Sequence, residues 1–143
     1  MKVLIDADAC PVTALAVQLC LGAGIHCILL CDTAHQIHYD GATTVTTDKG
    51  TDSVDYALIN RVAPGDVVIT QDYGLASMCL ARGARVLHQD GWEYTQDNIG
   101  ALLFQRHESR KYRAAGGRIK GPKKRTSEQD QAFAATLQKM LQG

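Results

Sequence analysis

Acidic residues follow two apolar runs and begin one helical pattern in this chain, and their type and spacing suit a divalent cation. Asp6 and Asp8 come after the run VLI, and Asp72 comes after the run VVITQ. Asp52 and Asp55 are three residues apart in TDSVDYALINRV, so they can share one face of a predicted helix. Carboxylates gathered without a cationic partner repel one another, and a bound metal ion is the usual reason for keeping them together.

Each group has a simpler explanation when taken alone. Asp6 and Asp8 suit a turn before Pro11, and acids at a helix start complement the helix dipole. If both apolar runs are neighbouring parallel strands, however, their ends meet at the edge where open α/β sheets bind ligands. Oxygen ligands are typical of Mg²⁺ and Mn²⁺. The sequence therefore predicts a Mg²⁺ or Mn²⁺ site whose metal ligands are Asp6, Asp8 and Asp72.

Phosphodiester hydrolysis is the chemistry that such a cluster can perform. A divalent cation can activate a water molecule and neutralise the charge that develops on the cleaved phosphate, so no protein nucleophile is needed. Thr70 or Ser53 can hold the water or a metal ligand by hydrogen bonding. We therefore predict a metal-dependent ribonuclease with the catalytic residues Asp6, Asp52, Asp55 and Asp72.

Strands that alternate with helices are predicted to position these residues. Apolar, β-rich runs predict strands at 2–6, 25–31, 43–47, 66–70 and 84–88. Helical spacing between them predicts helices that begin at Pro11, at Thr51 or Asp52, and at Gly74. The alternation indicates an α/β fold, a three-layer αβα sandwich with a mainly parallel central sheet.

The C-terminal third has a different character. A helical pattern begins near residue 95 and becomes increasingly basic, and a Gly- and Pro-containing basic loop is predicted at about 110–125. Thr126 and Gln129 form a capping-box pattern at the start of a last helix, at about 127–141. A length of 143 residues suits one domain over 1–143.

Charge is distributed unevenly along this neutral chain. Residues 1–105 hold five Lys and Arg against twelve Asp and Glu, whereas residues 106–125 hold nine against one. Such a basic arm suits phosphate contacts with RNA, with Trp92 and Tyr112 as candidates for base stacking. Arg106 begins this segment, and the predicted nucleic-acid-binding residues are Arg110, Lys111, Arg113, Arg118, Lys120, Lys123, Lys124 and Arg125.

The expected compartment is the cytoplasm. No run is apolar and long enough to span a membrane, and the first strand begins directly at the N-terminus without a signal segment. The five cysteines include no CxxC pair, which favours reduced thiols. We expect RNA as a partner and no membrane association.

Four longer motifs carry a resemblance to a known family. DADACPV, VVITQDYGLA, GWEYTQDNI and GGRIKGPKKRT resemble the signature stretches of the bacterial YaiI/YqxD family, and the similarity spans essentially the whole chain. The resemblance implies a PIN-like fold, which is related to metal-dependent ribonucleases. The compact DxDxC-Pro start and the basic Gly-Pro loop depart from typical PIN toxins.

The same resemblance implies positions for acidic residues. PIN-like nucleases carry them at the end of the first strand, on a central helix and at the end of the fourth strand. These positions match Asp6, then Asp52 or Asp55, then Asp72, with Asp8 and Asp90 as further candidates.

Two other functions are compatible with the sequence. A haloacid-dehalogenase-like phosphatase would use Asp6 of the DxD as a nucleophile, although Cys10 stands where that class has Thr or Val. A non-catalytic RNA-binding or ribosome-associated module would use the basic arm alone. Binding by such a module would depend strongly on salt and little on Asp6.

Overall fold

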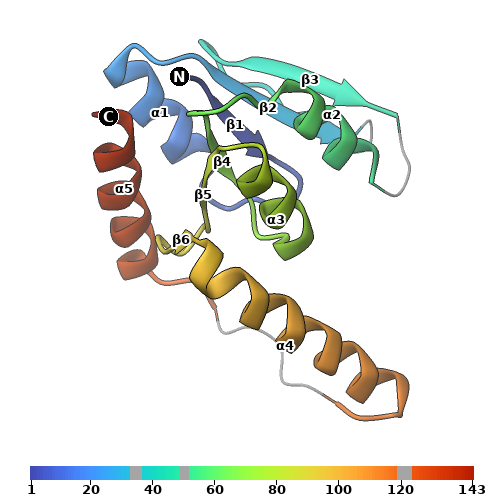
Figure 1. Cartoon of the computed structure of the whole chain (residues 1–143). Helices are drawn as coiled ribbons and strands as arrows, with labels where there is room; N and C mark the ends of the chain where they lie inside the picture. Colours follow the sequence, from blue (N-terminus) through green and yellow to red (C-terminus); the bar gives the residue numbers. More distant parts are fainter. Residues whose placement is uncertain (33–36, 49–51, 119–123) are drawn as a thin grey trace.

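A six-stranded sheet lies at the centre of the protein (Figure 1), in a computed structural model that describes residues 1–32, 37–48, 52–118 and 124–143. The strand order is β3-β2-β1-β4-β5-β6, in which β1 to β5 are parallel and β6 is antiparallel to β5. The strands are β1 (Val3–Asp6), β2 (Cys27–Asp32), β3 (Thr43–Thr47), β4 (Val67–Ile69), β5 (Arg85–Leu87) and β6 (Glu93–Tyr94).

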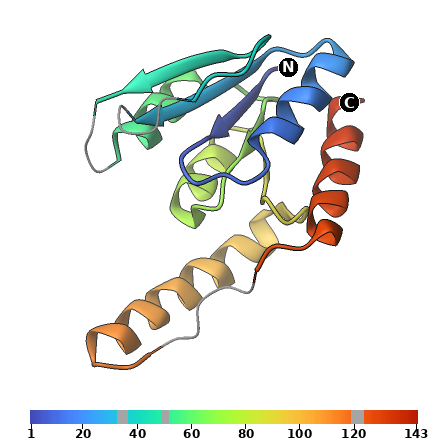
Figure 2. The same ribbon diagram turned by 180° about the vertical axis from the view of Figure 1, so that it is seen from behind.

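Helices cover both faces of the sheet, as Figures 1 and 2 show. One face is covered by α1 (Thr13–Ala23) and α5 (Ser127–Leu141), which contact each other. The other face is covered by α2 (Ser53–Arg61) and α3 (Tyr73–Ala81). This arrangement confirms the predicted α/β class, a three-layer αβα sandwich with a mainly parallel sheet.

The first strand shows why the chain forms these layers. Val3 and Ile5 are buried in the core on the α1 and α5 side, while Leu4 is buried on the α2 and α3 side. Successive strand side chains point to opposite faces, so a strand covered on both faces has to be apolar throughout. Asp6 follows this apolar run at the strand's carboxyl end.

The topological switch point of the sheet lies where β1 meets β4. The chain leaves β1 through α1 on one face of the sheet and enters β4 from α2 on the other face. A change of face between neighbouring parallel strands leaves the space beyond their carboxyl ends uncovered, and ligands of open α/β sheets bind there. Asp6 and Asp72 are both positioned at this edge.

Two helix starts differ from the sequence prediction for local reasons. α1 begins at Thr13 and not at Pro11, because a turn with Ala9 in the left-handed region (φ 58°) precedes it. Asp52 is the N-cap residue of α2, but its backbone is left-handed (φ 70°) and its side chain caps no amide. The alternative cap, Thr51, lies outside the described residues.

The C-terminal helices are largely as predicted. The Thr126–Gln129 capping box and α5 are confirmed. Helix α4 (Gln96–Ala114) projects from the body (Figure 2), so part of the segment predicted as a loop is helical. Strand β6 is too short for a periodicity signal and was not predicted. Among the described residues, no helix has the length and apolar character needed to cross a membrane.

Gly91 lies where the turn after β5 contacts α5, and this packing is testable. Its φ is 95°, and an added Cβ would lie 2.5 Å from the carbonyl carbon of Ala132. We expect Gly91→Ala to lower the free energy of unfolding by at least about 2 kcal/mol, because strain and a backbone clash combine. A Cβ added at Gly22, in α1, meets no atom within 4 Å, so Gly22→Ala should raise the free energy of unfolding by up to about 1 kcal/mol.

Urea denaturation of the two glycine variants measures both effects. A Gly91→Ala protein as stable as the wild type would contradict the close approach of α5 to this turn.

Candidate functional site

Thr70 joins the two acidic strand ends. Its hydroxyl donates a hydrogen bond to Asp6 Oδ2 (2.8 Å) and accepts one from the Asp72 backbone amide (3.0 Å). The Thr70 residue is buried, with 2% of its surface exposed. This contact was anticipated only as one way of holding a metal ligand, and here it fixes the Asp6 carboxylate beside the start of α3.

Asp72 is the N-cap residue of α3. Its Oδ1 accepts hydrogen bonds from the amides of Gly74 (2.9 Å) and Leu75 (3.2 Å). The same oxygen lies 3.3 Å from Nη1 of Arg106, which reaches it from α4. Capping of α3 therefore occupies one carboxylate oxygen of Asp72 and leaves the group a third exposed, with 35% of its side chain accessible.

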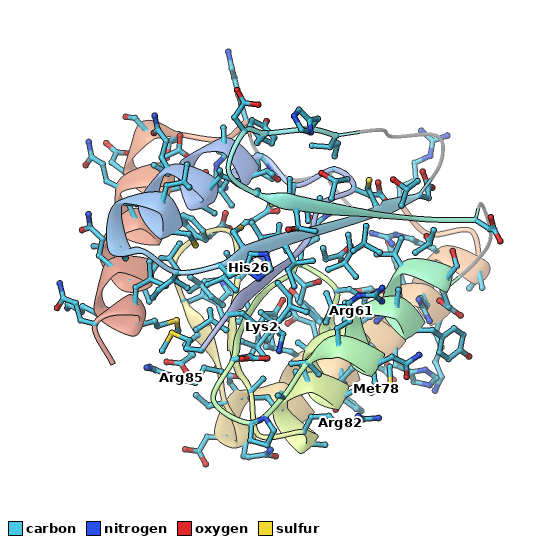
Figure 3. The ribbon with its side chains drawn as sticks, turned by 90° about the horizontal axis from the view of Figure 1, so that it is seen from above. Lys2, His26, Arg61, Met78, Arg82 and Arg85 are labelled. Atoms are coloured by element: carbon cyan, nitrogen blue, oxygen red, sulfur yellow. The ribbon has the colours of Figure 1, made fainter. Side chains whose placement is uncertain are left out.

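A pocket of about 260 Å³ lies beside Asp72 and is lined by residues of α2, α3 and α4. Met78, which Figure 3 labels on α3 beside α2, lies at its rim with 45% of the residue exposed. Tyr56, next to Asp55 on α2, is 65% exposed. The lining residues are Asp52, Asp55, Tyr56, Asp72, Gly74, Leu75, Met78 and Arg106.

Burial and repulsion between neighbouring carboxylates both disfavour the charged form of these acids. Burial, with additional repulsion from Asp55, Asp72 and Asp8, raises the pKa of Asp6 to about 6, although the Thr70 hydrogen bond opposes this shift. Burial also raises the pKa of Asp55 to about 6, together with repulsion from Asp72 and Asp52, against the opposing charge of Arg106. The predicted strand-end and helix acids therefore act on each other electrostatically.

Two further acidic candidates have other contacts. Asp8 Oδ2 accepts a hydrogen bond from the Asp32 amide (3.2 Å) at the end of β2. Asp90 accepts one from Arg125 Nη1 (2.8 Å), beside the turn that contacts α5. Asp8 thus remains near Asp6, whereas the interactions of Asp90 link that turn to the start of α5.

The types of ligand atom in this site suit a hard cation, but among the described residues their positions do not form a binding site. Carboxylate oxygens without enough compensating positive charge are the ligands that Mg²⁺ and Mn²⁺ prefer. In the described part of the chain, however, no three His, Cys, Asp or Glu side chains form a group that could hold a metal ion. Binding a cation here would require side-chain rotation, which the partial exposure of Asp72 permits.

The basic arm divides into exposed and engaged residues. Arg110, Lys111 and Arg113 are exposed on α4, and Arg118 and Lys124 are exposed beyond it. Lys120 and Lys123 lie outside the described residues. Arg125 is engaged structurally, because it donates hydrogen bonds to Asp90, Asp130 and the carbonyl of Gln89.

Of the two aromatic residues proposed for stacking, Tyr112 is exposed and Trp92 is partly buried. The Trp92 ring stacks on His88, with a centroid distance of 4.4 Å, and meets Tyr94 edge-on, so it has a packing role. Tyr112 is 54% exposed on α4. Sequence reasoning did not place Arg106 or Tyr56 at the pocket. Helical spacing does put Arg106 on the face of Ile99 and Leu103, which packs against the body.

Comparison with known proteins covers the whole of this site. The model of a family described as an uncharacterised YaiI/YqxD family matches residues 4–143. A UPF0178 protein of Exiguobacterium sibiricum is 50% identical over 141 residues, which cover 99% of this chain and 96% of the relative. Another, from Ruminiclostridium cellulolyticum, is 47% identical over 137 residues, covering 96% and 90% respectively.

The raised pKa of Asp6 predicts how stability depends on pH. A folded-state pKa of about 6 against an ordinary value of 3.8 means that ionisation at higher pH destabilises the fold. We expect Asp6→Asn to raise the free energy of unfolding by about 1–3 kcal/mol above pH 6, an advantage that vanishes below about pH 4. Denaturation of the variant and the wild type between pH 4 and pH 8 measures the difference.

Asp66 provides a control of opposite sign. Although burial opposes it, hydrogen bonds from Lys2 and the Ala63 amide lower the pKa of Asp66. Asp66→Asn should therefore destabilise the protein at neutral pH, and the loss should shrink as pH falls below 3.8. A destabilised Asp6→Asn protein at pH 8 would contradict the repulsive cluster.

Proposed function

This chain belongs to the YaiI/YqxD family, and we propose that it is a Mg²⁺- or Mn²⁺-dependent nuclease that cleaves RNA at the acidic pocket. The observation that carries the proposal is the gathering of acidic side chains beyond the strand ends: Asp55 and Asp72 line one pocket, and Thr70 joins Asp6 to the backbone amide of Asp72. Folding places these charges together at a cost, and a cation would relieve that cost. A cytoplasmic location fits such an enzyme.

The residues that line the pocket and those beside it at the strand ends would have different roles. When bound, a divalent cation supplies an activated water molecule and charge neutralisation for phosphodiester hydrolysis. Asp6 and Asp55 would hold that cation, with Asp72 contributing the oxygen that does not cap α3. Thr70 keeps Asp6 oriented, because its buried hydroxyl has a fixed donor and acceptor geometry. Asp8, which accepts a hydrogen bond from the Asp32 amide at the end of β2, would add negative charge near Asp6.

The exposed cations of the basic arm favour RNA as the substrate over a smaller phosphate ester. Arg110, Lys111 and Arg113 project from α4 away from an acidic body, and Arg118 and Lys124 add to their charge. Polyanions bind to such surfaces by charge neutralisation and counterion release, largely without reading sequence. A strand attached to this arm would be held close to the pocket.

A non-catalytic RNA-binding module is the second candidate. It is favoured by one observation, that no three potential ligands among the described residues form a group able to hold a metal ion. In that case the arm would bind RNA and the acidic residues would contribute no turnover. The two functions differ in whether Asp55 matters for the fate of bound RNA.

Cleavage assays separate these candidates. We expect Asp55→Asn and Asp72→Asn to reduce Mn²⁺-dependent cleavage of labelled single-stranded RNA at least 100-fold, because each removes a charge that binds the cation. Asn preserves the N-cap at position 72, so stability should change little. Asp40→Asn is the control, since that side chain is fully exposed on a loop. RNA binding without EDTA-sensitive cleavage by the wild type would favour the non-catalytic module.

The contribution of the basic arm to RNA binding can be measured by the salt dependence of the affinity. Replacing Arg110, Lys111 and Arg113 with Gln should weaken RNA binding and lower the slope of log affinity against log salt concentration by about 2 for single strands. Arg61→Gln and Arg82→Gln are the controls for loss of positive charge, because these residues lie at the C-terminal ends of α2 and α3 and not on the arm (Figure 3). An unchanged slope in the triple variant would rule out the arm as the RNA contact.

A further inference from the structure

Arg106 differs from the other basic residues of the arm in its position. It lies on α4, which packs against α3, and it lines the acidic pocket together with Asp55 and Asp72. Its side chain is 34% exposed, whereas Arg110 and Arg113 are exposed further along the helix. Arg106 is therefore a positive charge placed within the carboxylate cluster.

Stability alone does not explain this placement. The ion pair joins Arg106 Nη1 to Asp72 Oδ1 at 3.3 Å, and both side chains are about a third exposed. Exposed pairs of this kind contribute little to stability. The same oxygen already accepts two backbone amides of α3, so Asp72 does not depend on Arg106 for a partner.

The guanidinium of Arg106 also has N–H donors beyond the one that contacts Asp72. It has five N–H donors in a planar fork, and its hydrogen bonding to the described residues consists of the contact with Asp72. That fork matches two oxygens of a phosphate. A phosphodiester entering the pocket would thus meet a donor group that can exchange its single carboxylate contact for two phosphate contacts.

We propose that Arg106 binds the phosphate to be cleaved, so that a single RNA strand lies along α4 with its reactive phosphodiester in the acidic pocket. This inference rests on the proposed function and specifies the substrate of the same site. It assigns opposite roles to the charges of the pocket: the carboxylates attract the cation and Arg106 attracts the substrate.

The spacing of basic residues along α4 supports this path. Arg106, Arg110 and Arg113 are four and three residues apart, which places them on one face of the helix. With a rise of about 1.5 Å per residue, they extend about 10 Å from the pocket towards the end of the helix. Phosphates of one strand can follow this row, and the exposed ring of Tyr56 at the pocket can stack on an unpaired base.

Removal of the Arg106 charge should weaken the action on RNA without weakening Mn²⁺ binding. For Arg106→Gln we expect kcat/KM for single-stranded RNA to fall at least tenfold, with partial recovery in Arg106→Lys. Mn²⁺ binding, measured by calorimetry without RNA, should be unchanged or tighter, because a competing positive charge has left the pocket. Arg82→Gln, at the far end of α3, should alter neither property.

Binding measurements keep this inference separate from the proposed function. In an Asp55→Asn background, which we expect to be inactive, Arg106→Gln should weaken binding of a labelled single-stranded RNA dodecamer at least tenfold more than Arg82→Gln. If the wild type never cleaves RNA but this loss is seen, the nuclease proposal fails and phosphate binding by Arg106 stands.

Two outcomes would overturn the inference alone. One is an active wild type whose Arg106→Gln variant retains its kcat/KM. The other is a parallel loss of Mn²⁺ binding and of thermal stability in Arg106→Gln, which would show that Arg106 only maintains the pocket. Competition by duplex RNA as strong as by the single strand would exclude the single-stranded substrate.

Discussion

The buried hydroxyl of Thr70 holds the centre of this structure together. By donating to Asp6 and accepting from the Asp72 amide, it joins the ends of two neighbouring strands to the start of α3. Its own carbonyl accepts a hydrogen bond from the Tyr94 hydroxyl (3.2 Å), which ties β6 to the same point. One residue thus links the sheet edge, a helix cap and the short antiparallel strand, and it does so among carboxylates that repel one another.

The elements furthest from the pocket support this arrangement. Arg125, at the start of α5, binds Asp90 and the carbonyl of Gln89, and Gly91 lets the backbone of α5 approach the same turn. That turn leads directly into β6, whose Tyr94 reaches Thr70. The basic segment therefore contributes to folding through Arg125, and α5 helps to fix the end of β4 without contacting the pocket.

Sequence reasoning placed Asp6 and Asp72 at one edge of the sheet because parallel strands impose a simple rule: their carboxyl ends share that edge. Asp6 and Asp72 follow from that rule, and Asp55 follows from helical spacing. Other features depend on tertiary contacts that no local pattern encodes. Arg125 and Trp92 looked available for RNA, yet Arg125 donates to Asp90, which is distant in sequence, and the Trp92 ring stacks on His88. The left-handed backbone of Asp52 was equally invisible, because it is a non-glycine residue in a conformation that glycine favours.

Helix α4 projects from the body, and the chain returns to α5, which is anchored by the buried Phe133, Leu137 and Met140 (Figure 2). The 19 residues of α4 span about 28 Å at the regular rise of an α-helix. A helix fixed at its root keeps its outer cations at a set distance from the pocket. If α4 binds RNA as proposed, a strand held at its tip would meet the pocket as an intramolecular neighbour. Effective concentration, and not the affinity of either contact alone, would then govern how often the strand enters. Under the proposed function, such a geometry would favour strands long enough to reach both points, and short products would dissociate after cleavage.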